Sequence, residues 1–465
     1  GFAGRAAYTY ADRYIAEFNF GYNGSENFAK GNRFGFFPSI AAGWIVSEEE
    51  FMRPVQNYIN KLKLRASYGL AGNDRFYNDD GSQKRFAYIT TIGSTDGYKW
   101  GNSNAFYEKG GLREGDPGVE SLTWETVKKA NVGIELGLFK MAELQVDFFH
   151  ERREDIFMQR KNIPSSAGFP SAPWANYGIV TNKGFDISLD LNKQINKDWF
   201  ISARASVTYA KNKIIEQDED LGVLGTYRSS TGKPVGQIFG LVNDGLYTEA
   251  DFEDVTTGKL KPGLPVPKFS DRVYPGDIKY LDLNGDNEIT ETDKTAIGGT
   301  VNPELVYGFG INLSYKNIDF GAFFQGNGRT YRIIGENQKN FLPGSTIGAE
   351  GNIFTNASDA WTVDNPSQDV FYPRLHMGYN ANNAQVSDWW LKDMSMLRLK
   401  NVELGYSFSK NLIKKAAMEY ARIFVRGTNL LQFSKFDLWD PELNTSNGLK
   451  YPIMATYSIG LQVRF

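Results

Sequence analysis

The sequence predicts an all-β protein, and more specifically a transmembrane antiparallel β-barrel with long loops at one rim and short turns at the other. Two observations carry this prediction. Apolar and polar residues alternate along segments of about 10–15 residues, the length of a tilted membrane strand. In addition, the connections between these segments are alternately short and long.

Composition agrees with a barrel and excludes several other classes of protein. Aromatic residues make up 14% of the 465 residues, Gly occurs 48 times and Cys is absent, so neither a disulfide nor a thiolate metal site can form. The formal net charge of -3 gives no reason to expect nucleic acid as a partner. No apolar run approaches the ~18–20 residues of a membrane helix, and the first residues lack the pattern of a signal peptide. We therefore expect the sequence to start inside a folded region.

The alternation has a period of two. In "TYSIGLQVRF", the odd-numbered residues from Tyr457 to Phe465 are apolar, and the residues between them are Ser, Gly, Gln and Arg. Segments 201–209 and 307–315 alternate in the same way. Each such strand has one apolar and one polar face. A soluble β-sandwich is the alternative, but its strands usually span only about 5–6 residues, so strand length favours the membrane barrel.

We expect about thirteen strands, near residues 3–10, 14–22, 35–46, 61–71, 124–138, 143–153, 177–192, 199–211, 303–315, 318–326, 396–408, 420–430 and 455–465. Short turns follow the first, fifth and ninth strands, whereas long segments lie near 72–123, 154–176, 212–302, 327–395 and 431–454. In bacterial outer-membrane barrels the long loops are extracellular and the short turns periplasmic. This rule places the C-terminus of the chain in the periplasm.

Strand parity predicts that the barrel needs more strands than these. The first strand leads into a short turn and therefore starts at the outer rim, whereas the last strand ends at the periplasmic rim. A barrel with an even number of strands starts and ends on the same side. An open sheet edge in hydrocarbon would leave backbone N–H and C=O groups unsatisfied. We therefore expect an odd number of further strands upstream of this sequence.

The stretch "DLNGDNEITETD", residues 282–293, has the spacing of a twelve-residue calcium loop, in which oxygen atoms at positions 1, 3, 5, 7, 9 and 12 face one ion. The candidate ligands are Asp282, Asn284, Asp286, Glu288 through its backbone carbonyl, Thr290 and Asp293. Asn287 takes the sixth position, where a positive φ is needed, and Ile289 takes the eighth, as an apolar anchor. The alternative is an acidic turn without an ion, held by Asn and Asp side chains bonded to the local backbone.

The flanks of this loop indicate a structural role for calcium. Pro275 and Gly276 precede it and Gly298 and Gly299 follow it, so no pair of helices is present to move as in calcium sensors. The loop lies within the long segment 212–302, which we expect to be extracellular. Millimolar calcium outside the cell fills even a weak site.

Catalytic motifs are missing from the sequence, and we expect no enzyme. His150 and His376 have no G-x-S-x-G element nearby, and each is expected to be a solvated or rim histidine. Lys61, Lys63 and Arg65 alternate with apolar residues and would face the lumen, where we expect them to keep a water-filled interior solvated and paired. No residue can be assigned to substrate binding.

Several blocks resemble the SusC-type family of TonB-dependent outer-membrane transporters of Bacteroidetes. They are "YADRYIAEFNFGYNGSENFAKGNRFGFFPSIAAGWIVSEEEF", "INKLKLRASYGLAGND", "PGDIKYLDLNGDNEITETDKTAIGGTVNPELVYGFGINLSYKNIDFGAFFQG", "DMSMLRLKNVELGYSF", "GTNLLQFSKFDLWDPE" and the terminal "LQVRF". These blocks cover nearly the whole chain in order, and the resemblance is weakest near 74–120 and 327–390. It implies that residues 1–465 are the C-terminal portion of a barrel of about 22 strands, closed by a plug domain that has no match in this sequence.

The resemblance also implies a function. Members of the family import oligosaccharides or peptides across the outer membrane, energised through TonB, beneath a SusD-type surface lipoprotein that serves as a lid. The plug, the TonB contact and the other strands would come from an upstream segment or a companion chain, and the family permits dimers through the barrels. The alternative function is a passive pore or a structural barrel scaffold without TonB coupling.

Overall fold

The computed structural model describes residues 1–465 apart from 79, 103–104, 170, 336–341, 345–354 and 415–416. Its contacts divide the chain into two compact units. Unit 1 comprises residues 1–192, 208–224 and 231–233, and unit 2 comprises residues 193–207, 225–230 and 234–465. Among the described residues, no helix is long and apolar enough to cross a membrane.

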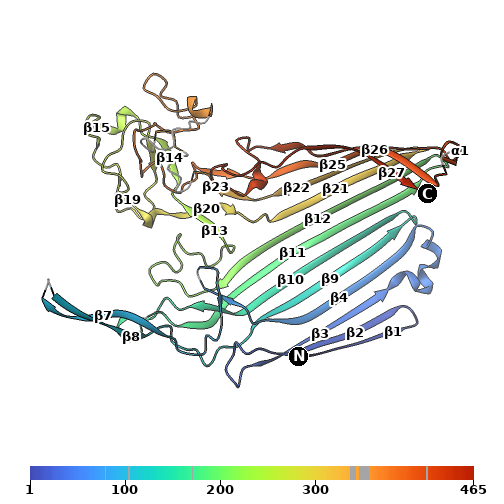
Figure 1. Cartoon of the computed structure of the whole chain (residues 1–465), viewed down its shortest axis with the longest axis horizontal. Coiled ribbons are helices and arrows are strands. Elements are labelled where there is room, and N and C mark those ends of the chain that lie inside the picture. The colour runs from blue at the N-terminus through green and yellow to red at the C-terminus, as the bar shows by residue number, and fades with distance from the viewer. Residues whose placement is uncertain (79, 103–104, 170, 336–341, 345–354, 415–416) are drawn as a thin grey trace. The chain divides into compact units, whose positions relative to one another are not determined.

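Thirteen strands form the main sheet, and each pairs with the next of these strands along the chain (Figure 1). They are β1 (Phe2–Tyr10), β2 (Tyr14–Gly24), β3 (Phe34–Ile45), β4 (Ile59–Asn73), β9 (Glu125–Leu138), β10 (Ala142–Gln159), β11 (Trp174–Gln194), β12 (Trp199–Glu216), β21 (Leu305–Tyr315), β22 (Ile318–Gly328), β25 (Met396–Ser407), β26 (Tyr420–Ser434) and β27 (Thr456–Arg464). Every strand expected from the sequence is present. Several are longer than expected, above all β10, β11 and β12.

Left-handed residues form the short turns between neighbouring strands. Ala11 and Asp12, which join β1 to β2, have φ of 52° and 55°, and Phe139 and Lys140, which join β9 to β10, have φ of 54° and 55°. Lys316, between β21 and β22, has φ of 53°. Positive φ at these positions matches the turn to the right-handed twist of the paired strands. The predicted tight turns are confirmed, although none of these positions carries the Gly that such turns favour.

The strands turn apolar side chains outward in each unit. On β9 of unit 1, Val132 and Ile134 are 55% and 39% exposed, whereas Gly133 between them is buried. On β21 of unit 2, Phe309 and Ile311 are 41% and 38% exposed. In a soluble sheet this face would pack inward, away from water. The exposed apolar face therefore supports the expectation that it contacts lipid.

The loops contain ordered strands that sequence periodicity did not predict. In unit 1, β7 (Ile92–Asn102) and β8 (Ala105–Glu114) form a hairpin within the segment 72–123 (Figure 1). The other short strands are β5 (Phe76–Tyr77), β6 (Gln83–Lys84), β13 (Gln237–Gly240), β14 (Asn243–Leu246), β15 (Phe252–Asp254), β16 (Lys259–Leu260), β17 (Val266–Pro267), β18 (Ile278–Tyr280), β19 (Glu288–Ile289), β20 (Thr295–Thr300), β23 (Tyr331–Ile333) and β24 (Leu391–Asp393). Segments this short fall below the length at which alternation can be recognised.

Helical structure is limited to short segments of three to six residues in the described part of the chain. The 3₁₀ turns are η1 (Val46–Glu48), η2 (Glu50–Val55), η3 (Ser165–Ala167), η4 (Glu249–Asp251), η5 (Glu291–Asp293), η6 (Thr355–Ser358) and η8 (Pro441–Leu443), and α1 (Lys410–Ile413) is one turn of α-helix.

In unit 2, the long loops form a packed body with its own apolar core. We call the described residues of 234–302, 329–395 and 434–454 the loop body. Its fully buried side chains include Leu241, Ile278, Ile289, Ile334 and Tyr372, drawn from segments far apart in the sequence. A core of this kind fixes the loops to one another, because opening any one of them would expose the apolar surface of the others.

In unit 1, a buried carboxylate anchors a loop to the end of β12. Asp218 is 6% exposed and accepts hydrogen bonds from Arg160 Nε, the Lys161 N–H and Asn162 Nδ2, each at 2.7 Å. Burial raises the pKa of the Asp218 carboxyl, but the bonds from Arg160 and from the backbone outweigh burial and lower the pKa to about 2. The anchor therefore holds its full charge at neutral pH.

Asp218→Asn is expected to destabilise unit 1 by about 1–3 kcal/mol, because it removes the ion pair with Arg160 and leaves buried donors poorly matched. The folded-state pKa lies below the ordinary value of 3.8, so the carboxylate stabilises the fold above about pH 4. This contribution is lost as the pH falls towards about 2. Thermal unfolding of the two proteins should differ at pH 7 and converge as the pH approaches about 2. A difference that is independent of pH would contradict this account.

Ile311→Arg, in the middle of β21, is expected to lower the free energy of unfolding of the complete barrel in lipid vesicles by about 2–4 kcal/mol, because it places a charge on the lipid-facing surface. Asn312→Arg is the matched control, since Asn312 points to the other face of the same strand. Equal effects of the two substitutions on unfolding would mean that the apolar face does not contact lipid.

Candidate functional site

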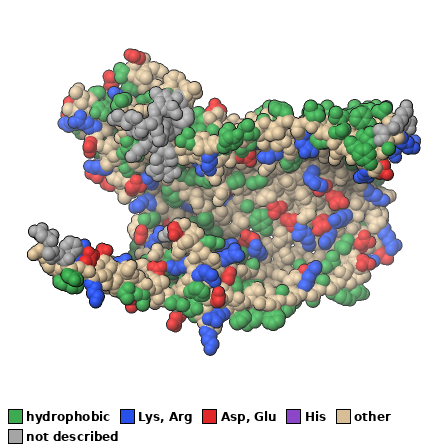
Figure 2. All heavy atoms as spheres, in the orientation of Figure 1, with side chains coloured by type: hydrophobic (Ala, Val, Ile, Leu, Met, Phe, Trp, Pro, Cys, Tyr) green, Lys and Arg blue, Asp and Glu red, His purple; other side chains and the backbone are tan. Residues whose placement is uncertain are grey.

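The polar face of unit 1 carries a cluster of paired charges. On β4, Lys61 and Lys63 lie 3.0 and 3.5 Å from the carboxylate of Glu135 on β9. Arg65 lies 3.4 Å from Glu135 and 2.6 Å from Asp147 on β10. The lysines and the arginine predicted to face the lumen thus share one polar face with acidic partners. Figure 2 shows basic and acidic side chains side by side across the sheet.

A glycine makes room for the ion pair between Arg65 and Asp147, which reaches across a whole strand. Arg65 reaches Asp147 across β9, over Gly133, which pairs with both residues in the sheet. A Cβ atom at Gly133 would lie 2.6 Å from Asp147 Oδ1 and 2.9 Å from the guanidinium carbon of Arg65. Any larger residue at this position would displace the ion pair. The bridge therefore ties three consecutive strands together through side chains as well as through the backbone.

Unit 2 repeats this arrangement. Arg422 on β26 forms an ion pair with Asp319 on β22 and donates to Glu403 on β25 at 2.6 Å. It crosses β25 over Gly405, where a Cβ atom would overlap the guanidinium. Arg426 donates to the other oxygen of Glu403, also at 2.6 Å. The charges on this face are paired with one another, as they are on the polar face of unit 1.

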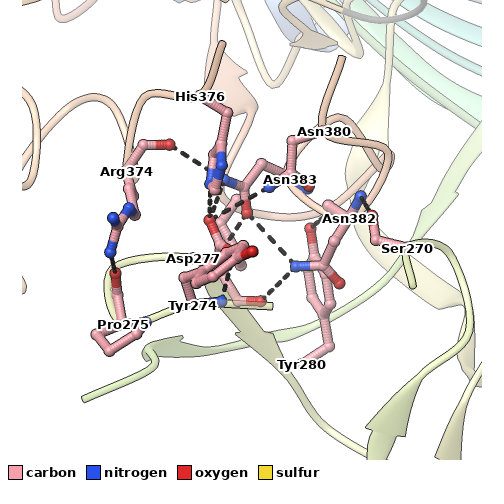
Figure 3. A network of polar contacts seen from close by, with 11 residues as sticks. Ser270, Tyr274, Pro275, Asp277, Tyr280, Arg374, His376, Asn380, Asn382 and Asn383 are labelled. Atoms are coloured by element: carbon pink, nitrogen blue, oxygen red, sulfur yellow. Dashed lines mark hydrogen bonds and ion pairs between the residues drawn. The ribbon is translucent and has the colours of Figure 1, made fainter. Parts of the chain in front are cut away.

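In the loop body, a buried carboxylate joins two long loops (Figure 3). Asp277 is fully buried, and its Oδ1 atom lies 2.5 Å from His376 Nε2 and accepts a hydrogen bond from Asn383 Nδ2 at 2.8 Å. Its Oδ2 atom accepts the Tyr274 N–H at 2.8 Å. His376 is therefore part of a packed network, which corrects the expectation of a solvated residue. A lone histidine in a loop sequence gives no sign of a partner 99 residues away.

Amide side chains extend the network to the backbone. Asn383 Oδ1 accepts the Ile278 N–H at 3.0 Å, and Asn382 Nδ2 donates to the Ile278 carbonyl at 2.9 Å. Both asparagines are buried. Figure 3 shows their side chains within the network around Asp277. Burying an amide side chain without a hydrogen bond costs folding free energy. Because the hydrogen bonds of both asparagines form only when residues 274–280 and 374–383 meet in one way, the network specifies the mutual arrangement of these two segments.

The calcium-type loop has a backbone conformation that suits an ion. Asn287, at the sixth position, has φ of 63°, which confirms the expected left-handed conformation. Ile289, at the eighth, is fully buried in the core of the loop body, as an apolar anchor should be. Asp282 accepts the N–H groups of Gly285 and Asn287 at 2.7 and 2.8 Å. Burial raises the pKa of Asp282, but these backbone bonds outweigh it and hold the pKa below its usual value.

The other candidate ligands also bond to the local backbone. Asn284 Oδ1 accepts the Asp286 N–H at 2.9 Å, and Asp286 Oδ1 accepts the Glu288 N–H at 2.8 Å. Asp293 is fully buried and accepts the N–H groups of Leu283 and Thr290. Among the described residues, no three acidic or histidine side chains lie close enough together to hold a metal ion. The loop is thus closed by hydrogen bonds between its own residues.

Known proteins resemble the chain over its full length. No protein-family model matches it. TonB-dependent receptors P26 and P3 of Formosa agariphila are 30% and 28% identical to it over 100% and 99% of the chain, and these matches cover 46% and 45% of the receptors. TonB-dependent receptor SusC of Bacteroides thetaiotaomicron is 25% identical over 99% of the chain and 43% of the receptor. The chain spans about half the length of the curated relatives it matches.

A solved structure shows the fold. The RagAB peptide importer in its closed-closed state matches 99% of this chain and 47% of its own chain, with a TM-score of 0.72 and 23% sequence identity. The sheet of the present chain therefore has the architecture of a TonB-dependent transporter barrel. With this fold and with relatives over its full length, the chain is similar to the SusC-type TonB-dependent receptors from end to end.

Proposed function

We propose that this chain forms the barrel part of a SusC/SusD-type complex that imports oligosaccharides or peptides across the bacterial outer membrane, energised through TonB. The observation that carries the proposal is the match of at least 99% of the chain to TonB-dependent receptors. The family comprises transporters rather than enzymes. The exposed apolar face and the paired charges of the polar face support a barrel with a lipid-facing exterior and a wet interior.

The orientation and the partners belong to the same proposal. The long loops, including 212–302, would be extracellular, and the C-terminus periplasmic. A SusD-like lipoprotein would close over the loop body, whose apolar core and Asp277 network make it a rigid support. The plug, the TonB contact and the remaining strands would be supplied by sequence outside these 465 residues or by a companion chain, and two barrels would associate as a homodimer.

Mass spectrometry of the native complex, extracted in mild detergent, is expected to find this sequence together with a plug domain, further strands and a SusD-like lipoprotein. Uptake of oligosaccharides or peptides by cells should then require TonB, and should stop when TonB is depleted, because displacement of the plug needs energy. Uptake that continues without TonB would support a passive pore instead. A complex that contains neither a plug nor further strands would contradict the transporter proposal.

We further propose that residues 282–293 bind one calcium ion as a structural staple, through Asp282, Asn284, Asp286, the Glu288 carbonyl, Thr290 and Asp293. Support comes from the oxygen spacing, the positive φ of Asn287 and the buried Ile289. The hydrogen bonds that close the loop would then serve as the scaffold on which the ligands gather.

Calcium is expected to protect the complete protein against proteolytic cleavage between residues 270 and 300, with half-maximal protection at about 0.1–1 mM, as in extracellular calcium modules. Asp282→Asn and Asp286→Asn should abolish the protection, because each removes a ligand charge. Asp271→Asn is the control, since Asp271 is exposed and lies outside the loop. Cleavage that does not respond to calcium in the unaltered protein would leave the hydrogen-bonded turn as the correct interpretation.

A further inference from the structure

Two cations lie directly opposite each other in the loop body. Arg332 on β23 pairs with Lys392 on β24 in an antiparallel register. Opposite residues on one face have Cβ atoms about 4.5–5.5 Å apart, and like charges at this spacing destabilise the pair. Their neighbours in the same register, Ile333 and Leu391, point to the other face and pack in the apolar core.

A third cation joins them through Asn444. Arg332 Nη2 donates to Asn444 Oδ1, and Lys450 Nζ donates to the Asn444 carbonyl at 2.9 Å. Lys392 Nζ donates to the Trp389 carbonyl at 3.1 Å and lies 5.2 Å from the centre of the Phe371 ring. We call Arg332, Lys392 and Lys450 the cation cluster. All of these hydrogen-bond acceptors are neutral.

Carboxylates near the cluster are bound to other cations. Asp440 and Glu442, a few residues before Asn444, form ion pairs with Arg398 at 2.5 and 3.1 Å. Within the described part of the chain, no carboxylate forms an ion pair with any member of the cation cluster. Arg332 and Lys392 thus face each other across two strands, Lys450 is linked to Arg332 through Asn444, and the described residues supply none of the three with an ion-paired carboxylate. Arg and Lys also retain several unused N–H donors.

Burial makes the positive charges of Arg332 and Lys392 unfavourable, and backbone hydrogen bonds hold the segments that carry the cation cluster in place. Burial lowers the pKa of both Arg332 and Lys392 below their ordinary values, because a charge withdrawn from water without a counter-ion is unfavourable. Gly335, which follows β23, donates its N–H to the Ser446 carbonyl at 2.7 Å and so ties β23 to the segment that carries Asn444. Asn444 and Lys450 are exposed, so one side of the cluster is open to solvent.

We propose that Arg332, Lys392 and Lys450 form a binding site for a small oxyanion, a carboxylate or sulfate group. A guanidinium donates two parallel hydrogen bonds to such a group, and two ammonium groups complete the set of donors. Binding relieves the repulsion across the β23–β24 pair and supplies the missing negative charge. The anion is carried either by the imported cargo, which rests on the proposed transport function, or by free ions in the medium.

The test uses the complete complex in detergent at low ionic strength, with sodium sulfate, acetate and glucuronate as probes and sodium chloride as the ionic-strength control. Isothermal titration calorimetry and thermal unfolding should show saturable binding of at least one oxyanion and a rise in the unfolding temperature. Lys392→Gln and Arg332→Gln are each expected to weaken this binding at least tenfold. Lys259→Gln is the matched control, because Lys259 lies in the same unit and is already paired with Glu253.

A second readout separates a binding role from a purely structural one. Without an oxyanion, Lys392→Gln should raise the unfolding temperature, because it removes the repulsion from Arg332. A lowered unfolding temperature in this variant, together with unchanged oxyanion binding, would overturn the proposal, as would the absence of saturable binding to the unaltered complex. If glucuronate binds more tightly than acetate and sulfate, the site is assigned to cargo. If the three probes bind equally, the site is assigned to free anions. Neither result depends on whether uptake requires TonB.

Discussion

The structure depends on one constraint: every backbone N–H and C=O group within the sheet must find its partner in a neighbouring strand, because hydrocarbon offers none. An up-and-down order satisfies this requirement with the shortest connections, and each of the thirteen strands pairs with the next along the chain. The left-handed residues at Ala11, Asp12, Phe139 and Lys140 make such close connections feasible. The alternation of apolar and polar residues follows from the same geometry, since a sheet that separates lipid from water has two unlike faces.

The parts of the molecule that this constraint dictates are predictable from the sequence. All thirteen long strands and the tight turns could be placed, because period-two alternation extends over many residues. The loops follow no such period. The hairpin of β7 and β8, the core around Leu241 and Ile278, and the contact between Asp277 and His376 arise from pairings between distant residues, which composition does not encode locally. Of the calcium-type loop, the conformation of Asn287 and the burial of Ile289 were predictable, since both follow from spacing alone.

The loop body shows how irregular segments can be held as firmly as a sheet. Removing its apolar side chains from water supplies the favourable free energy of packing, but this term alone tolerates many arrangements of similar volume. The buried polar groups are more selective, because Asp277, Asn382 and Asn383 are satisfied only when residues 274–280 and 374–383 meet in one register. The combination leaves few alternative packings. The half-buried Arg332 and Lys392 of the cation cluster are therefore held at fixed positions by the packed core beneath them.

The arginines that cross over Gly133 and Gly405 have a consequence for the electric field at the polar face of the sheet. Arg65 and Arg422 each form ion pairs with one carboxylate two strands away and with one on the strand between. Those nearer carboxylates, Glu135 and Glu403, also pair with other basic side chains. In these two clusters, positive and negative charge alternate over a few ångströms, so their fields largely cancel at the distance of a passing molecule. Such a face is hydrated, but its net electrostatic potential is small a few ångströms away. Under the proposed transport function, such a lining would favour neither sign of charge in a passing solute, and the discrimination between solutes would fall to other parts of the protein.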